Sequence, residues 1–338
     1  MNYGLPYKGS KNRIAKKILD VPPAAPVLYD VFCGGCAITH AALLSGKYSR
    51  VVANDINGMI PHAFEKALRG GFRDEDRWIS RNDFQKLYKT DPYAAICFSF
   101  GNNLHEYCYA RELEPYKRAL HYAIFWKDTG PWRELCPETA DALKAAVESE
   151  TDRHKRRIKA GRAIVKELKA GLMNGSIDPA VMDKPIYRKI RKEKTPGLRI
   201  KPAESVEHLK NLETLQTDES LCRLQSLGRL ERITGMDVPP VLTVTTGDYR
   251  ALNFERGGII YCDPPYKRTK ERYGREFDFA GFYAWCEHQV NPVFISEYTM
   301  PEDRFVPVAA FTVKRKMDTK KSSICPEKIW RPRCQLDI

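Results

Sequence analysis

Short apolar runs recur near both ends of this chain, and turn signals separate them from helical patterns. The first runs are Val27–Phe32 and Arg50–Asp55, followed by helical patterns over residues 36–47 and 59–71. An apolar run of this length bounded by turn residues is typical of a buried strand. The order of strand, helix and strand predicts a right-handed crossover and a parallel sheet.

The same alternation returns after residue 238, with a helical pattern over residues 279–290. Two further runs before the carboxyl end are expected to pair as a closing hairpin. The predicted late strands are Leu242–Asp248, Gly258–Asp263, Pro292–Tyr298, Phe311–Lys316 and Glu327–Pro332. We therefore expect one α/β domain built from residues 1–98 and 238–338.

The middle of the chain, residues 99–237, has a different pattern. It reads as long charged helices and loops, and two amphipathic helices are expected at 206–215 and 221–235. This region is predicted to be a mainly helical insertion that splits the α/β domain.

The charge of the insertion indicates the class of its partner. The chain carries a formal charge of +13 with a pI near 9.2. Residues 153–201 hold sixteen basic and four acidic side chains, which is nearly the whole surplus. Such a chain favours a polyanionic partner such as nucleic acid. Within "YRKIRKEKTPGLRIK", the predicted phosphate contacts are Arg188, Lys189, Arg191 and Lys192.

Other classes of protein find little support. No apolar run reaches the roughly 18 residues of a membrane span. The ten cysteines fit a reducing compartment, and a cytoplasmic location is expected. Cys33 and Cys36 form a C-x-x-C pair, but no second pair at comparable spacing exists for zinc. We expect two reduced cysteines in a glycine turn and no metal.

The turn "DVFCGGCAI" follows the first predicted strand, where a cofactor lies in such folds. Asp55 ends the next strand, where an acid typically accepts hydrogen bonds from ribose hydroxyls. This layout fits any nucleoside-bearing cofactor, so NAD stays open, although the turn lacks a full G-x-G-x-x-G. Asp248 ends a third strand and has two interpretations: it holds an adenine amino group, or it caps the next turn.

The segment "IIYCDPPY" carries the most specific chemistry. Proline fixes φ and removes a donor, so the loop after the strand is rigid and exposes its carbonyl groups. The Asp263 carboxylate and the Pro264 carbonyl then present two acceptors to one point, which suits a base amino group. Fixed acceptors favour localisation of the amine lone pair as charge develops. Tyr266 offers a face for a planar base, which must first leave its duplex.

Taken together, "PYKGSK", "DVFCGGCAI", "VVANDIN", "TTGDY" and "YCDPPY" resemble, in this order, the Dam-type DNA adenine-N6 methyltransferases. The resemblance covers roughly residues 3–103 and 242–338 and is weak in the middle, where the family places its target-recognition region. It implies a Rossmann-like, S-adenosylmethionine-dependent methyltransferase fold with an inserted, mainly helical DNA-recognition domain. It also implies double-stranded DNA as the partner and a bacterial cytoplasm, with a cellular or a phage genome as the source.

By position, the resemblance implies roles for individual residues. Tyr7 and Lys11 would contact S-adenosylmethionine, Phe32 and Gly34 would line its methionine end, and Asp55 would hold its ribose. Asp248 would hold the cofactor's adenine. The flipped adenine would bind at Asp263, Pro264 and Tyr266, and Asp263 would also face the cofactor. Two positions depart from the family pattern: Cys36 replaces the second glycine of the turn, and Tyr7 replaces a tryptophan.

Three alternatives stay open from the residues. Cytosine-N4 methylation needs the same two acceptors, although Asp rather than Ser at the head of "DPPY" favours adenine. Methylation of a glutamine side chain would favour Asn at that position and would not require a basic insertion. A DNA-binding regulator without catalysis would have no need of the intact Asp263 and Asp55.

Overall fold

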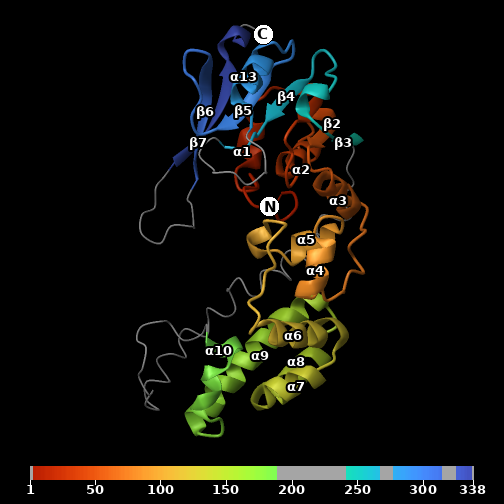
Figure 1. Ribbon diagram of the computed structural model, residues 1–338, viewed down its shortest axis with the longest axis vertical. Coiled ribbons are helices and arrows are strands. Elements are labelled where there is room, and N and C mark those ends of the chain that lie inside the picture. The colour runs from red at the N-terminus through yellow and green to blue at the C-terminus, as the bar shows by residue number, and fades with distance from the viewer. Residues whose placement is uncertain (1–2, 189–240, 267–276, 314–324, 337–338) are drawn as a thin grey trace. The chain divides into compact units, whose positions relative to one another are not determined.

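The chain forms two compact units, which Figure 1 shows in a computed structural model that describes residues 3–188, 241–266, 277–313 and 325–336. The first unit combines Met1–Arg73 with Arg229–Ile338, and the second is Asp74–Gly228. We call them the sheet unit and the helical unit. The division after Arg73 lies earlier than the boundary predicted after residue 98. The two amphipathic helices predicted at 206–215 and 221–235 lie outside the described residues.

The sheet unit is built on one seven-stranded mixed sheet with the order β3-β2-β1-β4-β5-β7-β6. The first five strands in this order pair in parallel, while β7 pairs antiparallel with β5 and with β6. The strands are β1 (Ala25–Asp30), β2 (Tyr48–Asp55), β3 (Val241–Thr246), β4 (Ile259–Cys262), β5 (Val293–Glu297), β6 (Phe305–Val313) and β7 (Cys325–Pro332). The α/β class, the parallel sheet and the closing hairpin are as predicted.

Strand β6 begins at Phe305, earlier than the predicted start at Phe311. Its register shifts between Pro307 and Ala309, where the ladder with β7 is irregular. Proline within a strand removes a ladder donor and is tolerated at edges and bulges. Because β6 is an edge strand of the sheet, it accommodates Pro307, and the proline hides the strand from a sequence pattern.

Helices follow the strands of the sheet unit. They are α1 (Ala15–Leu19), α2 (Ala37–Leu43), α3 (Met59–Leu68) and α13 (Phe279–Glu287). Helix α13 packs Phe282 and Cys286 into a buried cluster with Val27, Ile260 and Val293 from three neighbouring strands. Alternate residues of β1 therefore face this helix, which is the pattern expected of a strand buried on both faces.

The strand order reverses at β1, which lies between β2 and β4. In open α/β sheets, ligands bind outside the carboxyl ends of the strands at such a switch point. The glycine turn after β1 and the Asp263 segment after β4 both leave the sheet at this edge. The fold therefore brings together two segments that are more than two hundred residues apart in the sequence.

The helical unit has its own core, which includes Ala123, Trp132, Leu143 and Leu168, each fully buried. Its helices are α4 (Arg81–Leu87), α5 (Pro92–Cys97), α6 (Glu114–Trp126), α7 (Gly130–Leu135), α8 (Ala140–Glu148), α9 (Arg153–Asn174) and α10 (Pro185–Arg188). Helix α9 begins where the Asp152 side chain accepts a hydrogen bond from the Lys155 amide at 2.7 Å. It ends at Gly175, whose φ of 76° is left-handed.

Candidate active site

The amino-terminal segment packs directly on the glycine turn that follows β1. The Leu5 amide donates to the Gly35 carbonyl at 2.7 Å. A Cβ placed on Gly35 would lie 2.5 Å from Cβ of Tyr7, so only glycine allows this approach. Gly34 has a φ of 45°, and Cys36 is also left-handed at 57°. The structure therefore places Tyr7 beside Gly34, and Cys36 adopts the conformation that glycine favours.

Asp55 ties the glycine turn to the end of β2. One carboxylate oxygen accepts the Gly34 amide at 2.9 Å, and the other accepts the Asn57 amide at 2.9 Å. Burial raises the pKa of Asp55, although these two backbone donors oppose the rise. The carboxylate thus lies at the carboxyl end of β2, where the sequence placed it, and two backbone amides fix its position next to Gly34.

Phe32 lies in an aromatic cluster beyond β1. Its ring contacts Tyr249 at 5.2 Å, Phe277 at 5.9 Å and Phe282 at 5.7 Å between centroids. Part of the side chain stays exposed, so it offers an apolar wall at the switch point. Asp248 caps the short helix at Tyr249–Ala251 by accepting the Arg250 amide at 2.9 Å. It also forms an ion pair with Arg250 at 2.6 Å, which lowers the pKa of the Asp248 carboxyl.

A lysine and two carboxylates meet after the end of β4. Nζ of Lys11 donates to both oxygens of Asp263 at 2.7 Å and lies 3.9 Å from Oε1 of Glu327. The exposed fractions of the side chains are 7% for Lys11, 4% for Glu327 and 20% for Asp263. Asp263 is therefore the member of this network that an external group reaches most easily.

Opposing forces set the protonation of this network. Burial alone would lower the pKa of the Lys11 ammonium, but the charges of Asp263 and Glu327 outweigh it and raise the pKa. Burial also raises the pKa of Asp263, and Lys11 limits that rise. The charged pair survives in the interior because each partner satisfies the other.

Tyr266 is held on several sides. Its hydroxyl donates to Oε1 of Glu327 at 2.6 Å, and its ring stacks on Tyr298 with centroids 4.7 Å apart. Nζ of Lys11 lies 4.6 Å from the ring centroid. Burial, and then the charges of Asp263 and Glu327, raise the pKa of the phenol, so it stays a donor. Pro264 is buried beside it. These contacts fix the loop that the two prolines were predicted to stiffen.

Two residues of this site were missed by sequence reasoning. Glu327 lies on β7 and also accepts a hydrogen bond from the Ser296 hydroxyl at 2.7 Å. Asp30 ends β1, is 1% exposed and accepts from the Thr39 hydroxyl at 2.7 Å and amide at 3.0 Å. Burial raises the pKa of Asp30 to about 7. Both acids occupy strand positions where an apolar residue is usual. This departure from the apolar pattern was the sequence signal that pointed to them.

Most of the predicted phosphate contacts lie outside the residues that the structure describes. Arg188 is the last residue of α10, while Lys189, Arg191 and Lys192 lie outside the described residues. Cys33 and Cys36 are free thiols, as expected, with sulfur atoms 3.6 Å apart. Burial raises the pKa of both thiols, so neither is an activated nucleophile.

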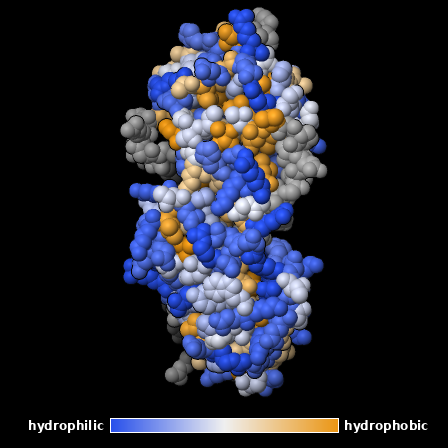
Figure 2. Space-filling view, turned by 90° about the vertical axis from the view of Figure 1, so that its right-hand side faces the viewer, coloured by the Kyte–Doolittle hydropathy of each residue, from blue (hydrophilic) through white to orange (hydrophobic). Residues whose placement is uncertain are grey.

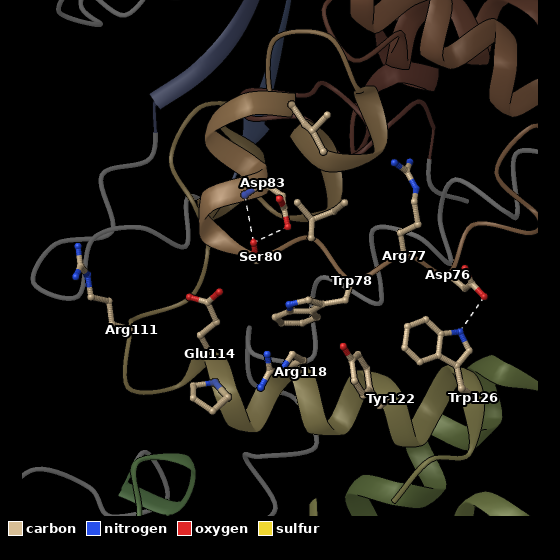
Figure 3. Close-up of a pocket in the computed structure, with 13 residues that line it drawn as sticks. Asp76, Arg77, Trp78, Ser80, Asp83, Arg111, Glu114, Arg118, Tyr122 and Trp126 are labelled. Carbon is tan, nitrogen blue, oxygen red and sulfur yellow. Dashed lines mark hydrogen bonds between the residues drawn. The ribbon is translucent and has the colours of Figure 1, made fainter. Parts of the chain in front are cut away.

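The helical unit contains a separate pocket of about 730 Å³, drawn in Figure 3. Arg118, Tyr122 and Trp126 point from α6 towards the loop that carries Trp78 (Figure 3). The Trp126 indole donates to Asp76 at 2.9 Å. None of the residues predicted for catalysis or cofactor binding lines this pocket, so it is distinct from the site at the switch point.

The described residues hold neither a metal-ion cluster nor a membrane-spanning helix. Those residues contain no group of three or more histidine, cysteine, aspartate or glutamate side chains arranged to hold a metal ion. They also contain no helix with the length and apolarity that crossing a membrane requires. The face drawn in Figure 2 is largely hydrophilic, and its hydrophobic residues gather in small patches.

The sheet topology and the acids at its carboxyl edge define the class of fold that binds a nucleoside-bearing ligand at a switch point. Residues 7–121 match the model of a protein family described as D12 class N6 adenine-specific DNA methyltransferase. The match covers about a third of the chain and ends before Asp263. No curated protein matches the chain.

The family match makes this protein an enzyme, an adenine-specific DNA methyltransferase that acts on N6 of adenine. It favours adenine over the cytosine-N4 alternative. DNA methyltransferases of this family use S-adenosylmethionine as methyl donor and have a fold suited to that cofactor.

Proposed function

We propose that the sheet unit transfers a methyl group from S-adenosylmethionine to N6 of an adenine turned out of duplex DNA, as in Dam-type enzymes. The observation that carries this proposal is the network of Lys11, Asp263, Tyr266 and Glu327 at the switch point. The network holds the Asp263 carboxylate in place and leaves it 20% exposed. An ion pair with a purely structural role would not need this exposure.

The residues at the carboxyl edge of the sheet suit the proposed cofactor. The glycine turn packs closely on Tyr7, since a Cβ on Gly35 would lie 2.5 Å from Cβ of Tyr7, and Gly34 beside it has a left-handed φ. Asp55 offers acceptors for ribose hydroxyls beside that turn, and Phe32 offers an apolar wall. S-adenosylmethionine would supply a methyl group on a sulfonium: the C–N bond to the adenine amine would form as the C–S bond breaks, the thioether S-adenosylhomocysteine would leave, and the amine would lose one proton. Asp248 is the predicted partner of the cofactor's adenine, and its carboxylate is 42% exposed although it pairs with Arg250.

Asp263, Pro264 and Tyr266 are proposed to receive the adenine. An ionised carboxylate has about four lone-pair sites, so Asp263 accepts from a base amine while it stays bonded to Lys11. The Pro264 carbonyl provides the second acceptor, and together they orient the two hydrogens of the amine. Acceptors fixed before reaction stabilise the positive charge that develops on nitrogen.

Lys11 and Glu327 are proposed as positioning residues. Lys11 was expected to contact the cofactor, but its ammonium is bonded to Asp263 in the structure. Its charge opposes the rise in the pKa of Asp263 that burial causes. Glu327 accepts a hydrogen bond from the Tyr266 hydroxyl and so fixes the ring beside the acceptors. The account needs no nucleophilic cysteine and no resident metal.

Recognition of double-stranded DNA is proposed for the inserted region, predicted as residues 99–237 and mainly helical. Arg188, Lys189, Arg191 and Lys192 remain the predicted phosphate contacts of its basic segment. We place the enzyme in a cytoplasm, because its cysteines and its DNA substrate fit that compartment.

Transfer of labelled methyl groups from S-adenosylmethionine to duplex DNA tests the proposal. Asp263→Asn keeps the size of the side chain but removes its charge, so methyl transfer should fall at least a hundredfold while DNA affinity stays within about twofold. Asp303→Asn is the matched control, because Asp303 is an exposed acid of the same unit. Equal turnover in both variants would remove Asp263 from the mechanism. Binding of cofactor and DNA without any transfer by the unaltered protein would favour the catalytically silent regulator.

A further inference from the structure

Helix α9 carries five basic side chains on one face. Lys155, Lys159, Arg162, Lys166 and Lys169 follow one another at intervals of four, three, four and three residues. Residues at these spacings lie above one another on a helix. The first four are exposed and Lys169 is half-buried. We call these five residues the cationic stripe.

Two other basic residues of α9, Arg153 and Arg156, bind backbone carbonyls of the helical unit. The Arg156 guanidinium is 7% exposed and donates to the backbone carbonyls of Glu150 at 3.0 Å and Thr151 at 2.8 Å. It also donates to the carbonyl of Ile124 near the end of α6. Arg153 donates to the Glu75 carbonyl at 3.0 Å. The helix therefore separates its charges: one side ties the helical unit together, and the opposite side forms the stripe.

The stripe lacks partners within the part of the chain that the structure describes. No hydrogen bond or ion pair joins its five side chains to another described residue through side-chain atoms. Some other surface cations are paired, such as Arg69 with Glu65, Arg133 with Asp141, and Lys144 with Glu148. The five successive positions of the stripe hold no acid, whereas charges of both signs alternate along an ordinary solvated helix face.

The arrangement works against the stability of the helix itself. Like charges three and four residues apart destabilise a helix. Cations near its amino end also oppose the helix dipole, which the Asp152 carboxylate at the N-cap offsets in part. A bound polyanion reduces the repulsion along the stripe.

We propose that the cationic stripe of α9 binds the phosphate backbone of the DNA substrate. From Lys155 to Lys169 it extends about 21 Å along the helix axis, which corresponds to roughly six base pairs of duplex. A membrane surface is a poorer fit, because an interfacial helix inserts an apolar face. Ile164, Val165 and Leu168 of α9 are instead buried in the core of the helical unit, and its exposed large apolar side chains are the separate Ile158 and Met173. Figure 1 shows α9 among the other helices of this unit.

The proposal rests on the proposed function, because it takes duplex DNA as the substrate. It adds a surface distinct from the Arg188–Lys192 segment predicted from the sequence. Since phosphate contacts carry no sequence information, the stripe should hold DNA of any sequence equally and position it for recognition elsewhere.

The test is the salt dependence of duplex DNA binding by the full chain. The variant Lys159→Gln, Arg162→Gln, Lys166→Gln should lower the slope of log K against log salt by about 2.7. Its affinity at 0.1 M salt should fall by roughly a hundredfold. The control Arg69→Gln, Arg133→Gln, Lys144→Gln removes the same charge from paired positions and should change the slope by less than about one.

Each outcome decides the proposal separately from the proposed function. An unchanged slope, or an equal change in the control, would overturn it even while the unaltered protein methylates adenine. A melting temperature below that of the unaltered protein would also overturn it, because it would reveal a structural role. Stripe-dependent binding to phosphatidylglycerol vesicles in preference to DNA would point to a membrane instead. If methyl transfer at saturating DNA and low salt keeps its kcat while the slope falls, the stripe is a DNA contact.

Discussion

The buried pair of Lys11 and Asp263 makes the sharpest prediction. In Lys11→Met the aliphatic length is kept, but the Asp263 carboxylate loses two hydrogen bonds of 2.7 Å. Breaking a buried ion pair by removing one partner costs about 3–5 kcal/mol. Since Asp263 is 20% exposed, water relieves part of this cost, and we expect a loss near the lower end, about 3 kcal/mol.

The second single variant and the double variant complete a cycle. Asp263→Asn should cost about 2 kcal/mol, because the remaining ammonium still has Glu327 at 3.9 Å. The double variant leaves no charge of this pair unpaired. Its cost should therefore be smaller than the sum of the single losses by about 2 kcal/mol.

Urea denaturation at a single pH measures the three free energies of unfolding. Lys17→Met is the matched control, since Lys17 is an exposed lysine of the same amino-terminal region, and it should change stability little. Activity should separate from stability: the double variant should be about as stable as Lys11→Met but transfer no methyl groups. Additive losses within about 0.5 kcal/mol would show that the pair does not interact, and the reasoning on this site would fail.

Four further predictions concern single residues. Asp55→Ala should weaken equilibrium binding of labelled S-adenosylmethionine by roughly thirtyfold and leave DNA affinity unchanged; unchanged cofactor binding would place the ribose elsewhere. Glu327→Gln should lower kcat about tenfold or more without changing KM for the cofactor, because Tyr266 loses its charged partner; a matching rise in KM would indicate direct contact instead. Gly35→Ala should lower the melting temperature and cofactor affinity together, because its Cβ meets Tyr7; an unaltered melting curve would contradict the close approach. Burial raises the pKa of Asp30 from an ordinary 3.8 to about 7 in the folded protein. Its contribution to stability is therefore full below pH 4 and is lost as pH rises through 7. Asp30→Asn should reduce the decline of the unfolding free energy over this window by on the order of 4 kcal/mol; a pH profile parallel to that of the unaltered protein would refute the assigned titration.

The strands of the sheet unit were predictable because apolar runs and turn residues are local signals. Val27–Phe32 and Gly258–Asp263 were placed almost where β1 and β4 lie. Strand β6 was predicted too short, because Pro307 and the register shift beside it interrupt the pattern. The pattern of a single segment does not determine the order of the strands in the sheet.

The position of Asp263 directly after a strand was predictable because the acid and two prolines follow an apolar run in the sequence. The network around them was not, since Glu327 reaches Tyr266 across sixty-one positions of the chain. A charged residue on a predicted edge hairpin is normally solvated, and only the packing of β7 beside β5 reveals that this one is buried. The two interpretations of Asp248 likewise needed the structure, which shows that it caps the turn.

The charge surplus of the basic run was predictable, but the sequence did not show which of its residues are buried and which form the stripe. "RHKRRIKAGR" contains residues of both kinds, and periodicity alone does not say which face of a helix is buried. Burial of Arg156 against backbone carbonyls assigns one face to the core and leaves the stripe on the other.

The most direct measurement is the identity of the methylated nucleoside. Duplex DNA of varied sequence, incubated with the purified protein and S-adenosylmethionine, is digested to nucleosides and analysed by mass spectrometry. The account predicts N6-methyldeoxyadenosine from the unaltered protein and from Asp303→Asn, and none from Asp263→Asn. Methylation of cytosine N4 instead, or equal adenine methylation by the Asp263 variant, would contradict it.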